Sequence, residues 1–219
     1  MLIVILASIT KRAQMPFSSW LPEAIAAPTP VSALVHSSTL VTAGVYLIIR
    51  FFPTLNHFIF IKFFCFYLGV LTCLIASTAA IVENDIKKII ALSTLRQLGI
   101  IIITLGLEQP KLAFFHLITH ALFKAMLFIC AGAIIHIRSG NQDIRLMGKL
   151  NDLSAIHMVF FNVANLSLCG IPFLAGFYSK DRILETFFIV SSPLFTSVLL
   201  ILTICLTGAY TIRLLIFTL

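Results

Sequence analysis

Three residues that can exchange protons recur at four-residue spacing within one long apolar stretch. His116, His120 and Lys124 would share one face of a helix, because positions i, i+4 and i+8 lie above one another. Burial favours the neutral form of a lysine, so a buried lysine can gain and lose a proton near neutral pH. Histidine already titrates there. The spacing therefore indicates a proton-transfer chain. The alternative is two structural core histidines and a lysine that extends to the membrane surface, which the central position of Lys124 disfavours.

A second group of residues surrounds a predicted break in a helix. Residues 170–181 include two glycines and Pro172 within a long apolar run. Proline removes a helical hydrogen bond and clashes with the preceding turn, so we expect the helix to break or unwind here. Discontinuous helices form ion sites in transporters, because freed carbonyls and helix ends point into the gap. Lys180 and Asp181 follow the break and are candidates for such a site; the alternative is a proline kink with an ordinary ion pair at the boundary.

A third group lies near the beginning of the chain. Lys11 lies in the first apolar stretch, and His36 is flanked by Ser and Thr hydroxyls that could support a hydrogen-bonded water chain. A single histidine in an apolar helix is more often structural, and only the other basic groups favour a role for His36. Gly-rich phosphate loops, haem-ligand pairs and cysteine clusters are not found in the sequence. We therefore expect no cofactor, metal or redox chemistry in this chain.

The composition indicates whether these candidate residues belong to a soluble protein or to a membrane protein. Hydrophobic residues make up 60% of the chain and charged residues 11%, whereas soluble domains have about a quarter of their residues charged. The net charge of +7 comes from basic residues that stand singly or in pairs at the ends of apolar runs. That distribution is typical of membrane proteins and argues against nucleic-acid binding.

The apolar stretches predict membrane-spanning helices. A spanning helix needs about 20 mostly apolar residues. Helices satisfy their backbone hydrogen bonds internally, and these runs are too long and continuous for a β-barrel. We predict an all-α, polytopic transmembrane helix bundle with discontinuous helices. The expected stretches are 1–20, 30–52, 58–81, 86–107, 111–137, 155–188 and 193–217.

The charges in the connections predict an orientation. Basic residues concentrate in alternate connections, and the richer side should face the matrix or cytoplasm. That side has Lys87, Lys88, Arg138, Arg145 and Lys149, and the other has mainly Arg50, Lys62 and Lys111.

Five segments, in order along nearly the whole chain, carry a resemblance to a known family. Residues 20–46, 85–95, 120–125, 142–148 and 170–181 resemble the signature of the antiporter-like, proton-pumping subunit 5 of mitochondrial NADH:ubiquinone oxidoreductase, respiratory complex I. The Mrp cation/proton antiporters share much of this pattern. The resemblance implies two inverted repeats, each with a broken helix and protonatable residues at mid-membrane. Residues 1–52 would be the end of the first repeat, and residues 58–219 the second.

The resemblance also assigns roles to the basic residues. It implies that protons cross the inner mitochondrial membrane along a buried chain, driven by quinone reduction in other subunits. NADH, FMN, iron–sulfur clusters and ubiquinone would be bound by those subunits, and the partners would be other membrane-arm subunits, the lipid bilayer and protons. The implied proton pathway comprises the lysine of the first broken helix, Lys11, the histidine of the next helix, His36, the central axis, His116, His120 and Lys124, and the distal lysine Lys180 with Asp181.

The same resemblance predicts that the sequence is an interior piece. Family members are far longer, and this chain would lack their amino-terminal helices, including a Glu paired with Lys11, and a carboxy-terminal lateral helix. We expect the isolated chain to be inactive. Two alternatives are a component of an Mrp-type cation/proton antiporter and a non-functional membrane fragment. A bacterial plasma membrane is the alternative location.

Three positions depart from the family pattern in one particular way. Arg12 and Arg96 stand where the family usually has Ser, and Ile25 stands where Met is frequent. Invertebrate mitochondria read AGA and AGG as Ser and AUA as Met, whereas the standard code reads them as Arg and Ile. We hypothesise that a mitochondrial gene segment, or a nuclear copy, has been translated with the standard code. Arg12 and Arg96 would then both be artefacts, placed where a buried guanidinium is costly.

Overall fold

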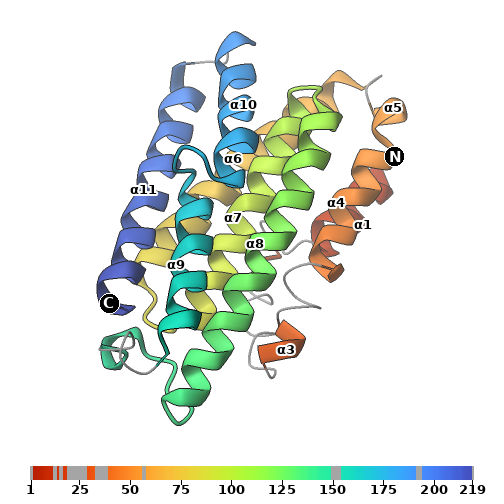
Figure 1. Ribbon diagram of the computed structural model, residues 1–219. Coiled ribbons are helices and arrows are strands. Elements are labelled where there is room, and N and C mark those ends of the chain that lie inside the picture. Colours follow the sequence, from red (N-terminus) through yellow and green to blue (C-terminus); the bar gives the residue numbers. More distant parts are fainter. Residues whose placement is uncertain are drawn as a thin grey trace.

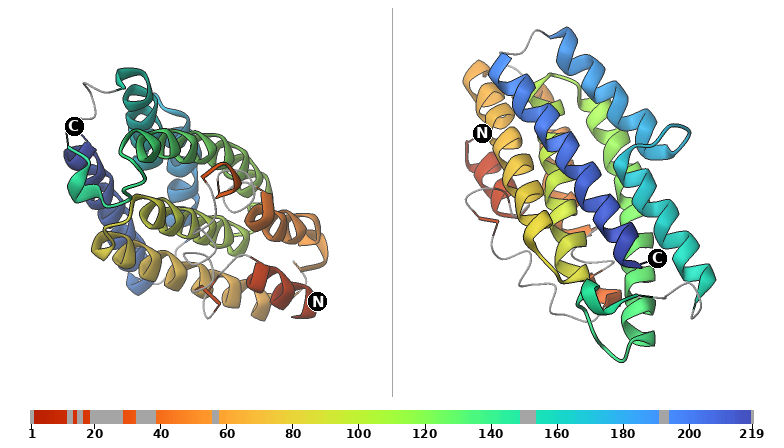
Figure 2. Two further views of the ribbon diagram at one scale, coloured as in Figure 1. Left: turned by 90° about the horizontal axis from the view of Figure 1, so that it is seen from below. Right: turned by 90° about the vertical axis from the view of Figure 1, so that its left-hand side faces the viewer.

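Helices dominate the computed structural model, which describes residues 2–11, 14, 17–18, 29–32, 39–55, 58–148, 154–190 and 194–218. Figures 1 and 2 show the long helices lying side by side as a bundle. The elements are α1 (Leu2–Lys11), α3 (Thr29–Val31), α4 (Leu40–Arg50), α5 (Phe52–Leu55), α6 (Ile59–Val82), α7 (Ile86–Gly106), α8 (Pro110–Ile137), η2 (Ile144–Leu146), α9 (Ala155–Cys169), α10 (Ala175–Ile189) and α11 (Leu194–Thr218).

Four of the described helices are long and apolar enough to cross a membrane. They are α6, α7, α8 and α11, with 24, 21, 28 and 25 residues. A bilayer core about 30 Å thick requires about 20 residues at 1.5 Å per residue. These helices match the expected stretches 58–81, 86–107, 111–137 and 193–217 to within one residue at either end. The predicted all-α membrane bundle is confirmed.

Helix α7 occupies the centre of the bundle. It contacts α6, α8 and α4, and nearly all of its side chains are buried. A helix that is apolar on every side must be covered on every side. Its polar side chains are consequently buried as well: Ser93, Thr94, Arg96, Gln97 and Thr104. The central helix therefore brings polar groups to the middle of an otherwise apolar protein.

Glycines let α6 and α7 approach closely. A Cβ on Gly69 would lie 2.9 Å from the carbonyl oxygen of Gly99, and a Cβ on Gly106 would lie 2.9 Å from the Cβ of Phe66. Small residues at helix interfaces permit such backbone contact in membranes, where van der Waals packing drives association. This close contact at Gly69, Gly99 and Gly106, called the α6–α7 seam below, fixes the position of α7 against α6.

The two ends of the bundle differ in their charged residues. The α6–α7 connection pairs with the segment after α8, since Ile86 N–H donates to the Gln142 carbonyl at 3.0 Å and Ile144 N–H to the Asn84 carbonyl at 3.0 Å. The Arg213 guanidinium also donates to the Glu83 carbonyl at 2.8 Å. Lys87, Lys88, Arg138 and Arg145 therefore gather at one end, whereas Lys62 and Lys111 begin α6 and α8 at the other. The assignment of the first end to the matrix stays a prediction.

The first third of the chain differs from expectation. Helix α1 ends at Lys11, and the described residues Gln14, Phe17 and Ser18 are not helical, although one helix was expected over 1–20. Pro16 accounts for the difference, because proline donates no backbone hydrogen bond and disfavours helix in the residue before it. The expected stretch 30–52 covers the end of α3, all of α4 and the first residue of α5, and residues 33–38 lie outside the described residues. The division into repeats at 52–58 stays a prediction.

Substitution of Gly69 by alanine should separate α6 from α7. Its methyl group would lie 2.9 Å from the Gly99 carbonyl oxygen and 3.0 Å from the Ile103 nitrogen, and both are backbone atoms. We expect a loss of about 1–3 kcal/mol in the free energy of unfolding, measured by thermal unfolding of the chain in detergent micelles. Gly208→Ala in α11 is the control, because a Cβ there meets nothing within 4 Å. Equal stability of the two variants would contradict the close contact at the α6–α7 seam.

Candidate functional site

The predicted break lies where the sequence placed it. Helix α9 ends at Cys169, Gly170 adopts the left-handed conformation with φ 90°, and α10 begins at Ala175. Glycine reaches this conformation without a Cβ penalty, which is why it ends many helices. Pro172 then prevents the helix from resuming at once. The result is a helix in two halves with an open connection.

Lys180 lies against the carboxyl end of the first half-helix. Its ammonium donates to the carbonyls of Leu168 at 2.6 Å and Cys169 at 3.2 Å, and the residue is 8% exposed. The last carbonyls of a helix have no partner within the helix, and the helix dipole makes this end negative. A cation is therefore held here by backbone oxygens. Asp181 is exposed and forms no ion pair with Lys180, so the alternative of an ordinary boundary ion pair is not what the described residues show.

His116 connects the broken helix to the central helix. Its Nδ1 lies 3.0 Å from the Ser179 hydroxyl on α10, and its Nε2 lies 3.3 Å from Oε1 of Gln97 on α7. The ring is fully buried. Ser179 is adjacent to Lys180 in sequence, so His116 touches the residue next to the distal lysine. Both nitrogens of one imidazole thus face hydrogen-bonding groups from two other elements.

Lys124 is buried at the opposite end of the same histidine–lysine row. Its ammonium donates to the Ser93 hydroxyl and, at 3.4 Å, to the Ile90 carbonyl, both on α7. It is 0% exposed. The expectation that Lys124 lies too deep to extend to the membrane surface agrees with this burial. Its use as a proton site stays a prediction.

His120 lies between these two groups. Its ring centroid is 6.3 Å from that of His116, and it packs edge-on against Phe123 at 5.6 Å. Neither ring nitrogen has a hydrogen-bond partner among the described residues. Buried polar atoms are almost always hydrogen-bonded, to protein or to ordered water. His120 is therefore the member of the row that the described side chains leave without a hydrogen bond.

The remaining predicted site residues are not part of this arrangement. Lys11 is exposed at the end of α1, which packs against α4. His36 lies outside the described residues. Sequence reasoning missed the three polar partners, Ser93, Gln97 and Ser179. Ser93 and Gln97 are polar residues four positions apart in an otherwise apolar helix. The same four-residue spacing identified His116 and His120 as candidates.

Arg96 is the largest fully buried side chain and lies in the same polar core. None of its guanidinium nitrogens makes a hydrogen bond of ordinary geometry among the described residues, although the Tyr210 hydroxyl lies close enough to interact with the guanidinium electrostatically. Two further cations, Lys124 and Lys180, lie within electrostatic reach. A cavity of about 210 Å³ is lined by Arg96, Lys180 and Asp181, but Asp181 forms an ion pair with neither cation. A serine at position 96 would remove this uncompensated charge.

The described residues form a membrane helix bundle in which a broken helix lies beside a buried row of histidine and lysine. The chain belongs to the NADH:quinone oxidoreductase/Mrp antiporter transmembrane family, whose model matches residues 1–207.

Curated relatives agree with this assignment. NADH-ubiquinone oxidoreductase chain 5 of Anopheles gambiae is 57% identical over 97% of this chain, and that of Locusta migratoria is 54% identical over 97%. The same chain of Phoca vitulina is 47% identical over 99%. The present chain spans 36%, 37% and 36% of the lengths of these three relatives. It is a multi-pass protein of the inner mitochondrial membrane.

Solved structures share the fold. The Mrp complex from a Dietzia species superposes with a TM-score of 0.88 and 31% identity, covering 97% of this chain and 24% of that one. An archaeal membrane-bound sulfane sulfur reductase superposes with a TM-score of 0.84 at 23% identity over 96% of this chain and 44% of that one, a likeness of fold alone.

Replacement of Arg96 by serine should stabilise the protein. Leaving one charge uncompensated inside a protein costs about 3–5 kcal/mol, and Arg96 is 0% exposed with no ion-pair partner among the described residues. We expect Arg96→Ser to unfold several degrees higher than the unmodified chain in detergent micelles. Arg96→Met, which keeps most of the side-chain volume, should also stabilise.

Arg50→Ser is the control for this prediction, because Arg50 is exposed at the end of α4 and its loss should change little. A lower unfolding temperature for both Arg96 variants would show that the guanidinium is an integral part of the core. The coding sequence provides an independent check. An AGA or AGG codon at position 96 is expected, and a CGN codon would refute the hypothesis of a misread genetic code.

Proposed function

We propose that this chain is part of the proton-translocating unit of NADH:ubiquinone oxidoreductase and moves protons along Lys124, His120, His116 and Lys180. The observation that carries the proposal is the placement of His116, which faces α7 through Gln97 and the broken helix through Ser179. One protonatable ring thereby links the central helix to the helix that holds Lys180. Family membership and the likeness to chain 5 sequences support it.

The geometry suggests how His116 would transfer a proton. With the Gln97 carbonyl as acceptor, Nε2 carries the proton and Nδ1 accepts from the Ser179 hydroxyl. Rotation of the Gln97 amide and exchange of the tautomer would free Nε2 to accept a proton from the side of His120, which would make the ring cationic. Nδ1 would then pass its proton to the Ser179 hydroxyl, and the hydroxyl would release its own proton towards Lys180. Histidine suits this role because its two nitrogens can act in sequence.

Electrostatic repulsion would give the transfer its direction. The described part of the row holds two lysines and two histidines and no carboxylate among its hydrogen-bonding partners. Like charges in a low-dielectric interior strongly disfavour one another. A proton added at Lys124 would therefore favour release at Lys180, where the helix end and an exposed Asp181 lie nearby. Changes in charge near one lysine would thus drive the next transfer.

The proposal includes the setting of the whole enzyme. The chain would act as a membrane-arm subunit, with NADH oxidation and ubiquinone reduction performed by other subunits that bind the redox cofactors. On its own it would have no oxidoreductase activity. Lys11, His36 and Asp181 remain proposed members of the pathway.

A second candidate is supported by the Mrp complex structure, which resembles this chain at 31% identity and a TM-score of 0.88. In that case the chain would be a component of a cation/proton antiporter. Neighbouring genes for a multi-subunit antiporter would favour this candidate. The higher identity to the chain 5 sequences, 47–57%, favours the respiratory enzyme.

Lys124→Met should uncouple proton transport in the assembled enzyme. Methionine keeps the length of the side chain and removes the titratable group, and Lys124 is 0% exposed. We expect NADH-driven acidification of proteoliposomes to fall at least about tenfold, since a positioned proton-transfer group contributes about 10²–10⁴. Lys111→Met is the matched control, an exposed lysine on the same helix. Acidification that survives Lys124→Met in a fully assembled enzyme would refute the role of Lys124.

A further inference from the structure

A cavity lies at the end of the bundle opposite the positively charged connections. Its volume is about 620 Å³, within the range of about 300–1,000 Å³ typical of small-molecule sites. The start of α6, the connection between α7 and α8, and the end of α10 form its walls. The lining residues used below are Lys62, Phe63, Phe66, Tyr67, Leu107 and Glu108.

The wall of this cavity is apolar and aromatic. Phe63 is 59% exposed and Tyr67 is 46% exposed, whereas Phe66 and Leu107 are buried at its floor. Phe63, Phe66 and Tyr67 lie in the first three turns of α6, and Leu107 directly follows α7. Helices of these lengths would leave the bilayer near this end of the bundle. Aromatic side chains concentrate at this level in membrane proteins. The cavity therefore lies where acyl chains meet phospholipid head groups.

One ion pair lies on the rim of the cavity. Lys62 on α6 contacts the Oε1 atom of Glu108, and their side chains are 18% and 52% exposed. Glu108 has φ 63°, a left-handed conformation that is uncommon for residues other than glycine. Such backbone strain persists only where the surroundings impose it, and it concentrates at ligand sites. The conformation places this carboxylate beside the ammonium of Lys62.

Both members of the pair retain hydrogen-bonding capacity. The Lys62 ammonium has three donors and uses one on Glu108 Oε1 among the described residues, where Glu108 Oε2 has no hydrogen-bond partner. A molecule that carries one anion and one primary ammonium a few atoms apart could bind both groups at once. Its phosphate would accept from Lys62, and its ammonium would donate to Glu108.

We propose that this cavity binds a zwitterionic phospholipid with a primary-amine head group, of the phosphatidylethanolamine type. The phosphate pairs with Lys62 and the ammonium with Glu108, while an acyl chain covers Phe63 and Tyr67. The opposite charges on the rim match this head group better than an anionic one, which Glu108 would repel. The quaternary amine of phosphatidylcholine cannot donate a hydrogen bond to Glu108. The site is separate from the buried histidine and lysine row.

Lipid selectivity tests the proposal directly. The chain is placed in nanodiscs of phosphatidylethanolamine, phosphatidylcholine and phosphatidylglycerol in equal amounts. It is then released into mild detergent, and retained lipids are counted by native mass spectrometry. We expect retained phosphatidylethanolamine to exceed each of the others about tenfold, because hydrogen bonds between charged groups are stronger than those between neutral groups. Lys62→Met should abolish this excess.

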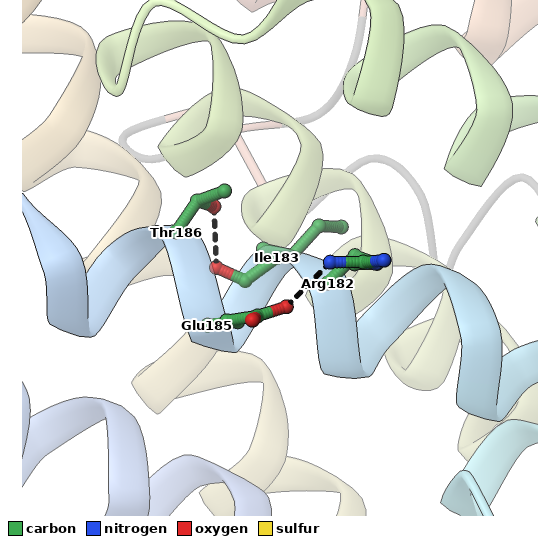
Figure 3. A network of polar contacts seen from close by, with 4 residues as sticks. All are labelled: Arg182, Ile183, Glu185 and Thr186. Carbon is green, nitrogen blue, oxygen red and sulfur yellow. Dashed lines mark hydrogen bonds and ion pairs between the residues drawn. The ribbon is translucent and has the colours of Figure 1, made fainter.

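Glu108→Gln gives the decisive result, because a purely structural ion pair would not alter lipid selectivity. Removal of the carboxylate leaves Lys62 unopposed, so the preference should move from phosphatidylethanolamine to phosphatidylglycerol. Glu185→Gln is the matched control. It breaks the Arg182–Glu185 ion pair of 2.9 Å, which is exposed on α10 and borders none of the described cavities (Figure 3).

Three outcomes would overturn the proposal. They are equal retention of the three lipids, a preference of the unmodified chain for phosphatidylglycerol, and unchanged selectivity in Glu108→Gln. Circular dichroism of each variant confirms that the helices are retained, so that a loss of lipid is not a loss of fold.

Discussion

The cost of holding cations away from water governs this structure. A lysine at mid-membrane is unfavourable unless the protein supplies hydrogen-bond acceptors. Here the acceptors are neutral: backbone carbonyls of Leu168 and Cys169 for Lys180, and the Ser93 hydroxyl with the Ile90 carbonyl for Lys124. A carboxylate partner would favour the charged form of a lysine strongly. Neutral acceptors favour it less, which suits the proton transfer proposed for Lys124 and Lys180.

This requirement explains the broken helix and the polar central helix. A continuous helix at residues 155–189 would use the Leu168 and Cys169 carbonyls internally and leave Lys180 without acceptors. A fully apolar α7 would leave Lys124 and His116 equally unsupported, because Ser93 and Gln97 are their partners. The α6–α7 seam then keeps α7 close enough to be buried on all sides. The broken helix and the polar residues of α7 therefore meet the same need, because both supply hydrogen-bond partners to buried lysine and histidine side chains.

Much of this could be predicted from the sequence, and the limits have physical causes. Hydropathy places α6, α7, α8 and α11 because the bilayer sets the length of a helix. Pro172 and Gly170 locate the break because their backbone effects are local. Ser93, Gln97 and Ser179 were missed as site residues because hydroxyls and amides are common in helices, and only tertiary packing shows which of them meet a histidine or lysine. The end of α1 at Lys11 was missed because hydropathy does not register Pro16.

Arg96 is the exception that the same principle identifies. Lys124 and Lys180 each donate to acceptors at hydrogen-bond distance, whereas no guanidinium nitrogen of Arg96 does so among the described residues. A guanidinium cannot lose its proton, so it cannot escape the cost of burial by becoming neutral as a lysine can. A small hydroxyl side chain at this position would resemble Ser93, three residues earlier on α7, which already serves Lys124. The chemistry of the core therefore favours serine at position 96, independently of any knowledge of the codon.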